Sequence, residues 1–242
     1  MNKLNYGYES SASIKPLLIL FIVTVLSQLA YPIYAASVSS QAITPLLLPS
    51  LLFISALTIP SLVIGSRLNS KTSANCHLIT PPTRSGLQFA ILSGVALGAT
   101  LLILRLVLQP YLPEALPAYG FRGVTGGLLV SLGAAIAEEV WFRYGLLTLV
   151  FYAYLTLTKT ERLSQISALV LIILVAFVFG LAHLPQLLSF GAGSLFAIWA
   201  TILGNVAVGI LYGWCFWRYG LFTAIIAHFT LDLVLHMLPA MV

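Results

Sequence analysis

The residues best able to do chemistry in this chain are carboxylates and histidines that lie inside strongly apolar stretches. Only six acidic residues occur, and Glu138, Glu139 and Asp232 are embedded among apolar residues, as are His183 and His228. A charge in the middle of a membrane helix costs on the order of 2.5–3.5 kcal/mol on insertion scales, so such residues are usually functional. Carboxylates and imidazoles together can activate water or relay protons. We therefore expect these five residues to converge on one wet cavity.

The two adjacent glutamates are expected to have different roles. Successive residues on a helix diverge by about 100°, so Glu138 and Glu139 cannot point the same way. Glu139 precedes Arg143 by four residues, the favoured order for an ion pair on one helix face. Glu138 is then free to face a cavity, where it can take a proton from water and return it to a leaving amine. The alternative is that both glutamates only stabilise helix packing.

The two histidines sit in different contexts. His183 ends an apolar run, with Phe179 one turn earlier on the same face, and a lone histidine at this place is more often interfacial than a ligand. His228 and Asp232 are four residues apart and hence neighbours on one helix face. Asp232 could fix the histidine tautomer, contact a substrate or complete a metal site.

The composition of the chain indicates whether it folds in water or in a lipid membrane. The 242 residues are 60% hydrophobic and only 7% charged, and the mean hydropathy is +1.04. Soluble domains are roughly one quarter charged, so we predict a multi-pass integral membrane protein. The net charge of +5 comes from basic residues scattered between apolar runs, which is typical of membrane loops and excludes nucleic acid as a partner.

The apolar runs predict an all-α bundle, because a spanning helix needs roughly 20 such residues. Seven runs qualify: Pro16–Tyr34, Leu46–Ile64, Leu87–Leu108, Val124–Leu147, Ser164–His183, Ser194–Trp217 and Leu221–Leu238. The aromatic stretch Phe151–Leu157 either extends the fourth span or lies in the interface as an eighth element. Residues 1–123 would form three N-terminal spans, and residues 124–242 would form the core that carries the polar residues.

Basic residues predict the orientation of the bundle. Lys15 precedes the first span and Arg67 and Lys71 follow the second, whereas the first and fifth connections have no Lys or Arg. Basic loops stay on the cytoplasmic side, which puts the N-terminus in the cytoplasm and, in a bacterial chain, the protein in the cell membrane. Arg105 and Arg122 flank the third connection on the opposite side and run against this pattern.

One distance conflicts with a shared cavity. In these spans His183 lies at the outer end of its helix, while His228 is only about 12 Å from the inner end of its own. The two side chains can meet only if the helices are tilted, broken or shifted from these boundaries.

Three short patterns follow one another along the chain, each in an apolar run: Glu138-Glu139-x-x-x-Arg143, Phe179-x-x-x-His183 and His228-x-x-x-Asp232. In this order they resemble the three signatures of the CPBP intramembrane peptidases. This family comprises CAAX proteases and bacteriocin-processing enzymes, and includes the Ras-converting endopeptidases. The resemblance covers roughly residues 124–238. Its third signature usually ends in Asn or Asp, so Asp232 is within the pattern.

The resemblance implies peptide-bond hydrolysis inside the membrane. Glu138 would act as general base with His183 positioning the water, and His228 and Asp232 would stabilise the oxyanion. The other implied roles concern positioning: Glu139 and Arg143 would hold the helix and the substrate end in place, and Phe179 would wall the substrate pocket. The implied partners are membrane lipid and a peptide or lipidated protein, either a prenylated CAAX-type substrate or a leader peptide.

The resemblance leaves the cofactor open. Members of the family are often described as metalloproteases, and Glu138, His183 and His228 could bind Zn with one position open for water. The chain contains no HExxH motif, the usual helical arrangement for a zinc protease. A glutamate mechanism without metal and a zinc mechanism are therefore both compatible with the sequence.

Two other functions also put ionisable groups inside a membrane. A non-catalytic scaffold, chaperone or immunity protein could retain the CPBP fold, but it would not need Glu138. A transporter or proton relay often has repeated halves with broken helices. No internal repeat stands out in this sequence. The prediction is therefore an intramembrane endopeptidase.

Overall fold

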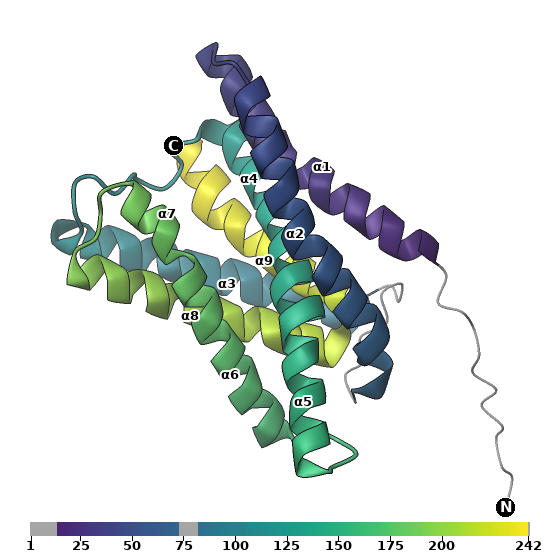
Figure 1. Cartoon of the computed structure of the whole chain (residues 1–242). Coiled ribbons are helices and arrows are strands. Elements are labelled where there is room, and N and C mark those ends of the chain that lie inside the picture. The colour runs from purple at the N-terminus through teal and green to yellow at the C-terminus, as the bar shows by residue number, and fades with distance from the viewer. Residues whose placement is uncertain (1–13, 73–81, 242) are drawn as a thin grey trace, which may run out of the picture.

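The computed structural model describes residues 14–72 and 82–241, and all regular secondary structure in these residues is helical. Among the described residues, seven helices are long and apolar enough to cross a membrane, which confirms the predicted all-α bundle. The helices cross at varied angles, and α8 runs across the direction of α5 (Figure 1). The protein is a multi-pass integral membrane protein.

The spans agree with the predicted runs to within a few residues at most ends. The helices are α1 (Ile14–Ser39), α2 (Thr44–Leu68), α3 (Arg84–Leu108), α4 (Gly123–Glu138), α5 (Thr148–Thr158), α6 (Gln165–Ala182), α7 (Leu184–Ser189), α8 (Leu195–Tyr219) and α9 (Leu221–Asp232). Two π-helical stretches extend this set, Glu139–Leu147 between α4 and α5 and Leu233–Met237 after α9.

The aromatic stretch after the fourth predicted span is part of that span. Through the π-helix, α4 and α5 form one continuous element, Gly123–Thr158. Of the two placements left open by the sequence, the extension is therefore the observed one. A π-helical turn is wider than an α-turn and often marks a functional site. Here it begins at Glu139, directly after the cavity-facing candidate Glu138.

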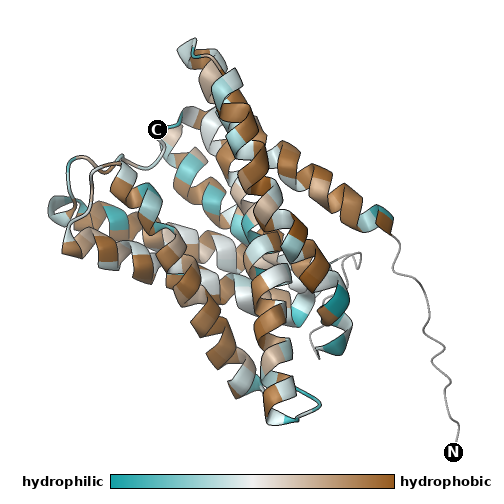
Figure 2. Ribbon diagram, viewed as in Figure 1, coloured by the Kyte–Doolittle hydropathy of each residue, from teal (hydrophilic) through white to brown (hydrophobic). Residues whose placement is uncertain are grey.

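The outer surface of the bundle is apolar and the polar residues lie between helices. Large side chains such as Leu92 and Val170 are 69% and 57% exposed on α3 and α6. Figure 2 shows hydrophobic colour along the outward faces of α1, α6 and α8, and hydrophilic colour where α9 passes behind α4. Exposed apolar helices surrounding buried polar groups are expected of a protein dissolved in lipid.

Small residues let the N-terminal helices approach the helices that carry the polar patterns. A Cβ atom added at Gly94 of α3 would lie 2.8 Å from the Ala227 carbonyl oxygen of α9. A Cβ atom at Gly133 of α4 would lie 2.8 Å from the Ser27 carbonyl oxygen of α1. Close backbone contact at small residues is a common basis of helix association in lipid. The division of the chain at residue 123 stays a prediction.

Replacing Gly94 with Ala is expected to lower the free energy of unfolding by about 1–3 kcal/mol, because the added methyl group forces α3 and α9 apart. The matched control is Gly204→Ala in α8, where an added Cβ atom meets no described atom within 4 Å. That change should leave stability unchanged or raise it by about 0.5–1 kcal/mol through helix propensity. Denaturant unfolding in detergent measures both. Equal stability of the two variants would contradict the close α3–α9 contact.

Candidate active site

Glu138, His183 and His228 come from three different helical elements and meet at one point. Glu138 ends α4, His183 follows α6, and His228 lies in α9. The Nε2 atoms of both histidines lie 3.9 Å from the Glu138 Oε2 atom. The predicted convergence is thus observed among these residues.

The conflict between the levels of the two histidines is resolved by the tilt of α8. In Figure 1, α8 runs across the direction of α5, and α9 turns back from the end of α8. His228, eight residues along the chain from Gly220, is thereby brought level with His183 at the end of α6. Tilt was one of the three conditions under which the two side chains could meet, and hydropathy specifies the length of a span but not its tilt.

Behind this point lies a buried ion-pair network. Arg143 Nε is 3.2 Å from Glu139 Oε2, as the four-residue spacing predicted, and both side chains are at most 1% exposed. Arg143 also donates to the Gly209 carbonyl oxygen at 3.3 Å, and its guanidinium lies 4.5 Å from the centre of the Phe179 ring. A planar guanidinium can combine hydrogen bonds with aromatic stacking in this way.

Glu139 also fixes the orientation of His228. The His228 Nδ1–H group donates to Glu139 Oε1 at 2.8 Å, and the other ring nitrogen, Nε2, lies 3.5 Å from Asp232 Oδ2. Tyr212 of α8 stacks on the imidazole at 4.3 Å between ring centres. The sequence left open whether Asp232 fixes the tautomer of His228. In the structure Glu139 has that role, because it accepts the hydrogen bond from Nδ1–H. Contacts with Glu139, Asp232 and Tyr212 therefore fix the orientation of the His228 ring.

His183 is oriented by its own helix. Its Nδ1 lies 2.8 Å from the Phe179 carbonyl oxygen, which can only accept, so the Nδ1 atom carries the proton. The Nε2 atom is then left to face Glu138. The Phe179 ring packs edge-on against the imidazole at 4.6 Å, and against Phe142 at 5.0 Å.

A cavity of about 820 Å³ opens beside these residues. Its wall includes Glu138, Phe179, His183, His228 and Asp232, whereas Glu139 and Arg143 lie behind the wall. A smaller pocket of about 300 Å³ reaches Glu138 and His183 from the side of α2. The volume is ample for a peptide segment, since typical ligand pockets range over about 300–1,000 Å³. The predicted contact of Arg143 with substrate stays a prediction.

Several residues of this cavity were not predicted from the sequence. Tyr212, Arg105 and Tyr119 all line it. Arg105 gave a signal, because a charge inside the apolar run of α3 is costly, but it was interpreted only as a topological residue. Asn205 also faces the cavity, and its side chain donates within its own helix to Thr201 O at 2.9 Å.

The predicted zinc site gains no support from this arrangement. Within residues 14–72 and 82–241 no group of three His, Cys, Asp or Glu side chains is placed to hold a metal ion. Both ring nitrogens of His228 lie beside carboxylates, 2.8 Å from Glu139 and 3.5 Å from Asp232. Glu138, His183 and His228 as arranged do not fit a metal ion.

Comparison with known families gives one match, to the segment that contains these residues. Residues 120–234 match the family model described as type II CAAX prenyl endopeptidase Rce1-like. No curated protein and no solved structure matches the chain significantly. The matched segment contains every pattern from Glu138 to Asp232, and its description is that of a protease acting on prenylated substrates. Over residues 120–234, the chain is therefore similar to the type II CAAX prenyl endopeptidase Rce1-like family, in agreement with its resemblance to the CPBP peptidases.

Proposed function

We propose that this protein is an intramembrane endopeptidase that hydrolyses a peptide bond in a prenylated, CAAX-type substrate. The observation that carries the proposal is the position of Glu138, whose carboxylate borders the cavity at 3.9 Å from two imidazole nitrogens. These separations exceed the range of a direct hydrogen bond, about 2.7–3.2 Å, and suit a shared water molecule. A carboxylate base between two oriented imidazoles can take a proton from a water molecule held there.

In the first step Glu138 removes a proton from water as the water oxygen attacks the scissile carbonyl carbon. His183 accepts a hydrogen bond from the same water, because its Nδ1 proton is committed to Phe179 and its Nε2 lone pair is free. The carbonyl π electrons move to oxygen and form a tetrahedral oxyanion. Positioning of the water contributes by fixing the direction of attack.

His228 supports the proposal as a donor to the oxyanion. Its Nδ1–H is held by Glu139, and Asp232 lies 3.5 Å from Nε2, so both ring nitrogens lie beside carboxylate oxygens that can accept hydrogen bonds. An Nε2–H donor aimed into the cavity stabilises developing negative charge. Asp232 accepts hydrogen bonds when ionised, so in this proposal it orients His228 and does not itself donate to the oxyanion.

In the second step the oxyanion collapses and the bond between carbonyl carbon and amide nitrogen breaks. Glu138 returns its proton to the leaving nitrogen, which departs as a neutral amine, and the carboxyl product remains on the other fragment. Water is consumed and the glutamate is regenerated. Nothing in this sequence of steps requires a redox partner.

The proposal extends to where the protein acts. The basic residues Lys15, Arg67 and Lys71 support an N-terminus in the cytoplasm and, in a bacterial chain, a location in the cell membrane. A leader peptide is the second substrate class that the resemblance suggests. The prenylated class is favoured because the matched family model names a prenyl endopeptidase.

The test compares polypeptide termini in host membranes that carry either the wild-type chain or the Glu138→Gln variant. We expect new termini that depend on Glu138, located a few residues from the natural C-terminus of lipidated proteins. Glu161→Gln is the matched control, because Glu161 is exposed in the connection between α5 and α6. Identical termini in all three membranes, with equal protein levels, would favour the non-catalytic scaffold.

A further inference from the structure

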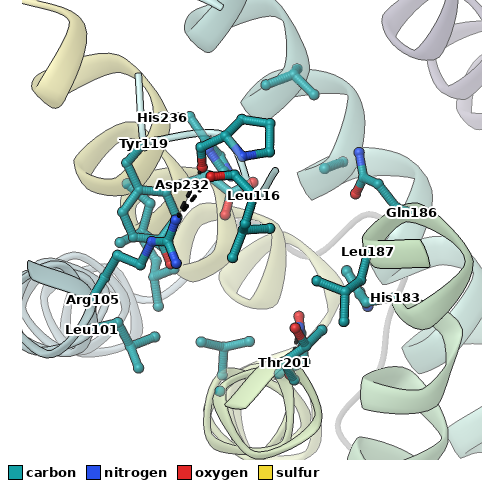
Figure 3. A pocket seen from close by; sticks show the side chains of 18 of the residues that line it. Leu101, Arg105, Leu116, Tyr119, His183, Gln186, Leu187, Thr201, Asp232 and His236 are labelled. Carbon is teal, nitrogen blue, oxygen red and sulfur yellow. Dashed lines mark hydrogen bonds between the residues drawn. The ribbon is translucent and has the colours of Figure 1, made fainter. Parts of the chain in front are cut away.

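The cavity has a second polar region at some distance from Glu138. It is formed by Arg105 of α3 and by Tyr119 and Arg122 of the connection before α4, and we call it the arginine cluster. Figure 3 shows Arg105 and Tyr119 on one side of the cavity, with Asp232 and His236 near them, and His183 on the opposite side. The arginine cluster and the candidate catalytic residues thus share one continuous cavity.

Two nitrogen atoms of the cluster are hydrogen-bond donors without an acceptor among the described residues. Arg105 Nη2 donates to the carbonyl oxygens of Leu116 and Pro117 at 3.4 and 3.2 Å (Figure 3), but its Nη1 atom is buried with no partner among the described residues. Arg122 Nε is likewise buried and unpartnered within that part of the chain. An unmet buried donor is costly, about 1–3 kcal/mol and more on a charged group, which favours an acceptor from a ligand.

The cluster also carries charge that no acid neutralises directly. Within residues 14–72 and 82–241 neither Arg105 nor Arg122 has a carboxylate oxygen within 4.0 Å. Burial raises the pKa of the Tyr119 phenol, with Arg105 opposing the shift, so Tyr119 is a neutral donor at physiological pH. Cationic donors next to a neutral hydroxyl make a site for an anion.

Aromatic side chains hold the guanidinium groups in place. Arg105 lies 5.8 Å from the Tyr119 ring centre, and Arg122 lies 4.2 Å from Phe121 and 5.5 Å from Tyr31. Together with the two carbonyl contacts of Arg105, this packing fixes the planes of both side chains. Preorganised guanidinium groups match the planar geometry of a carboxylate.

The cluster is connected to the candidate catalytic residues through His236 and the shared cavity wall. His236 lies one turn beyond Asp232, a rise of roughly 5–6 Å, and its ring is 6.0 Å from that of Tyr119. A peptide whose scissile bond lies at Glu138 can therefore extend along the same cavity toward the arginine cluster.

We infer that Arg105 and Arg122, assisted by Tyr119, bind the free C-terminal carboxylate of the substrate. The cluster would make the enzyme selective for bonds close to a free C-terminus. This inference rests on the proposed endopeptidase function and adds residues outside the three sequence patterns. Cationic residues can also bind a lipid phosphate, but the cluster faces the same cavity as Glu138, which favours the substrate.

The experiment measures binding separately from cleavage. The probe is acetyl-(S-farnesyl)Cys-Val-Val-Ala, prepared as the free acid and as the C-terminal amide, and titrated into Glu138→Gln protein in phosphatidylcholine nanodiscs. We expect the acid to bind roughly 10- to 100-fold more tightly than the amide, the value of a charge-assisted hydrogen bond. Cleavage of the same two peptides by the wild-type protein is measured in parallel.

Variants on the Glu138→Gln background locate the effect. Arg122→Gln and Arg105→Lys should each bring the ratio of acid to amide affinity toward one, and Arg105→Lys keeps a cation that supports the connecting loop. Arg162→Gln, on the exposed connection between α5 and α6, should leave the ratio unchanged. The ratio is internal to each variant, so a general loss of folded protein cannot produce the expected pattern.

Each outcome separates the two proposals. Selective binding of the acid without cleavage by the wild-type protein would support the arginine cluster and overturn the peptidase. Cleavage by the wild-type protein with equal binding of acid and amide would support the peptidase and overturn the role of the arginine cluster. If anionic phosphatidylglycerol raises thermal stability through Arg105 and Arg122 while acid and amide bind equally, the ligand is a lipid headgroup and the inference fails.

Discussion

The Glu138→Gln variant is expected to lower kcat by about 10²–10⁴-fold, the usual contribution of a general base, while its thermal unfolding matches that of the wild type. Glutamine keeps the size of the side chain but cannot accept a proton from water. The side chain is 21% exposed toward the cavity, so its amide group does not replace a buried charge. Cleavage of the farnesylated peptide and unfolding in the same detergent measure the two effects.

The neighbouring glutamate provides the sharpest contrast to this variant. Glu139 is fully buried and contacts both Arg143 and His228, so Glu139→Gln should lower stability as well as kcat. Glu161→Gln on the exposed connection should change neither quantity. A Glu138→Gln protein that cleaves at the wild-type rate would remove Glu138 from the mechanism, whatever the family match.

Residue type and spacing sufficed to find the candidate site because lipid penalises charge so heavily. Glu138, His183 and His228 stood out as ionisable groups in apolar runs, and the Glu139–Arg143 pair followed from helix periodicity alone. Local patterns carry this information, since each depends only on residues within one or two turns of a helix.

Relations between helices were not predictable in the same way. The hydrogen bond from His228 to Glu139 joins residues 89 positions apart, and nothing in either local pattern specifies it. Likewise, hydropathy does not determine the direction in which α8 crosses the other helices, and α9 starts from the end of α8. The π-helical stretch Glu139–Leu147 was also missed, because it depends on packing between helices and has no recognised local signature.

Arg105 shows a different kind of failure, in which the signal was present but was assigned to topology. A basic residue near the end of a span was counted toward orientation, and it ran against the pattern of the other loops. Its position on the cavity wall explains that exception without revising the orientation. A residue that breaks the charge rule of a membrane protein is therefore a candidate for a functional role.

Replacing Arg143 with Met is expected to lower the free energy of unfolding by about 3–5 kcal/mol, the usual cost of removing one partner of a buried ion pair. Methionine has a similar length but leaves the fully buried Glu139 carboxylate with the His228 ring as its one remaining side-chain partner within the described chain. The measurement is denaturant unfolding in mixed micelles, with the exposed Arg162→Met as control.

A double variant distinguishes loss of charge pairing from loss of packing. In Glu139→Gln/Arg143→Met the buried charge is gone, so part of the lost stability should return relative to Arg143→Met alone. The guanidinium also packs against Phe179 and Tyr212, at 4.5 and 5.2 Å from their ring centres, and that contribution should not return. Stability that falls further in the double variant would mean that the Glu139–His228 hydrogen bond, and not the ion pair, holds this part of the bundle together.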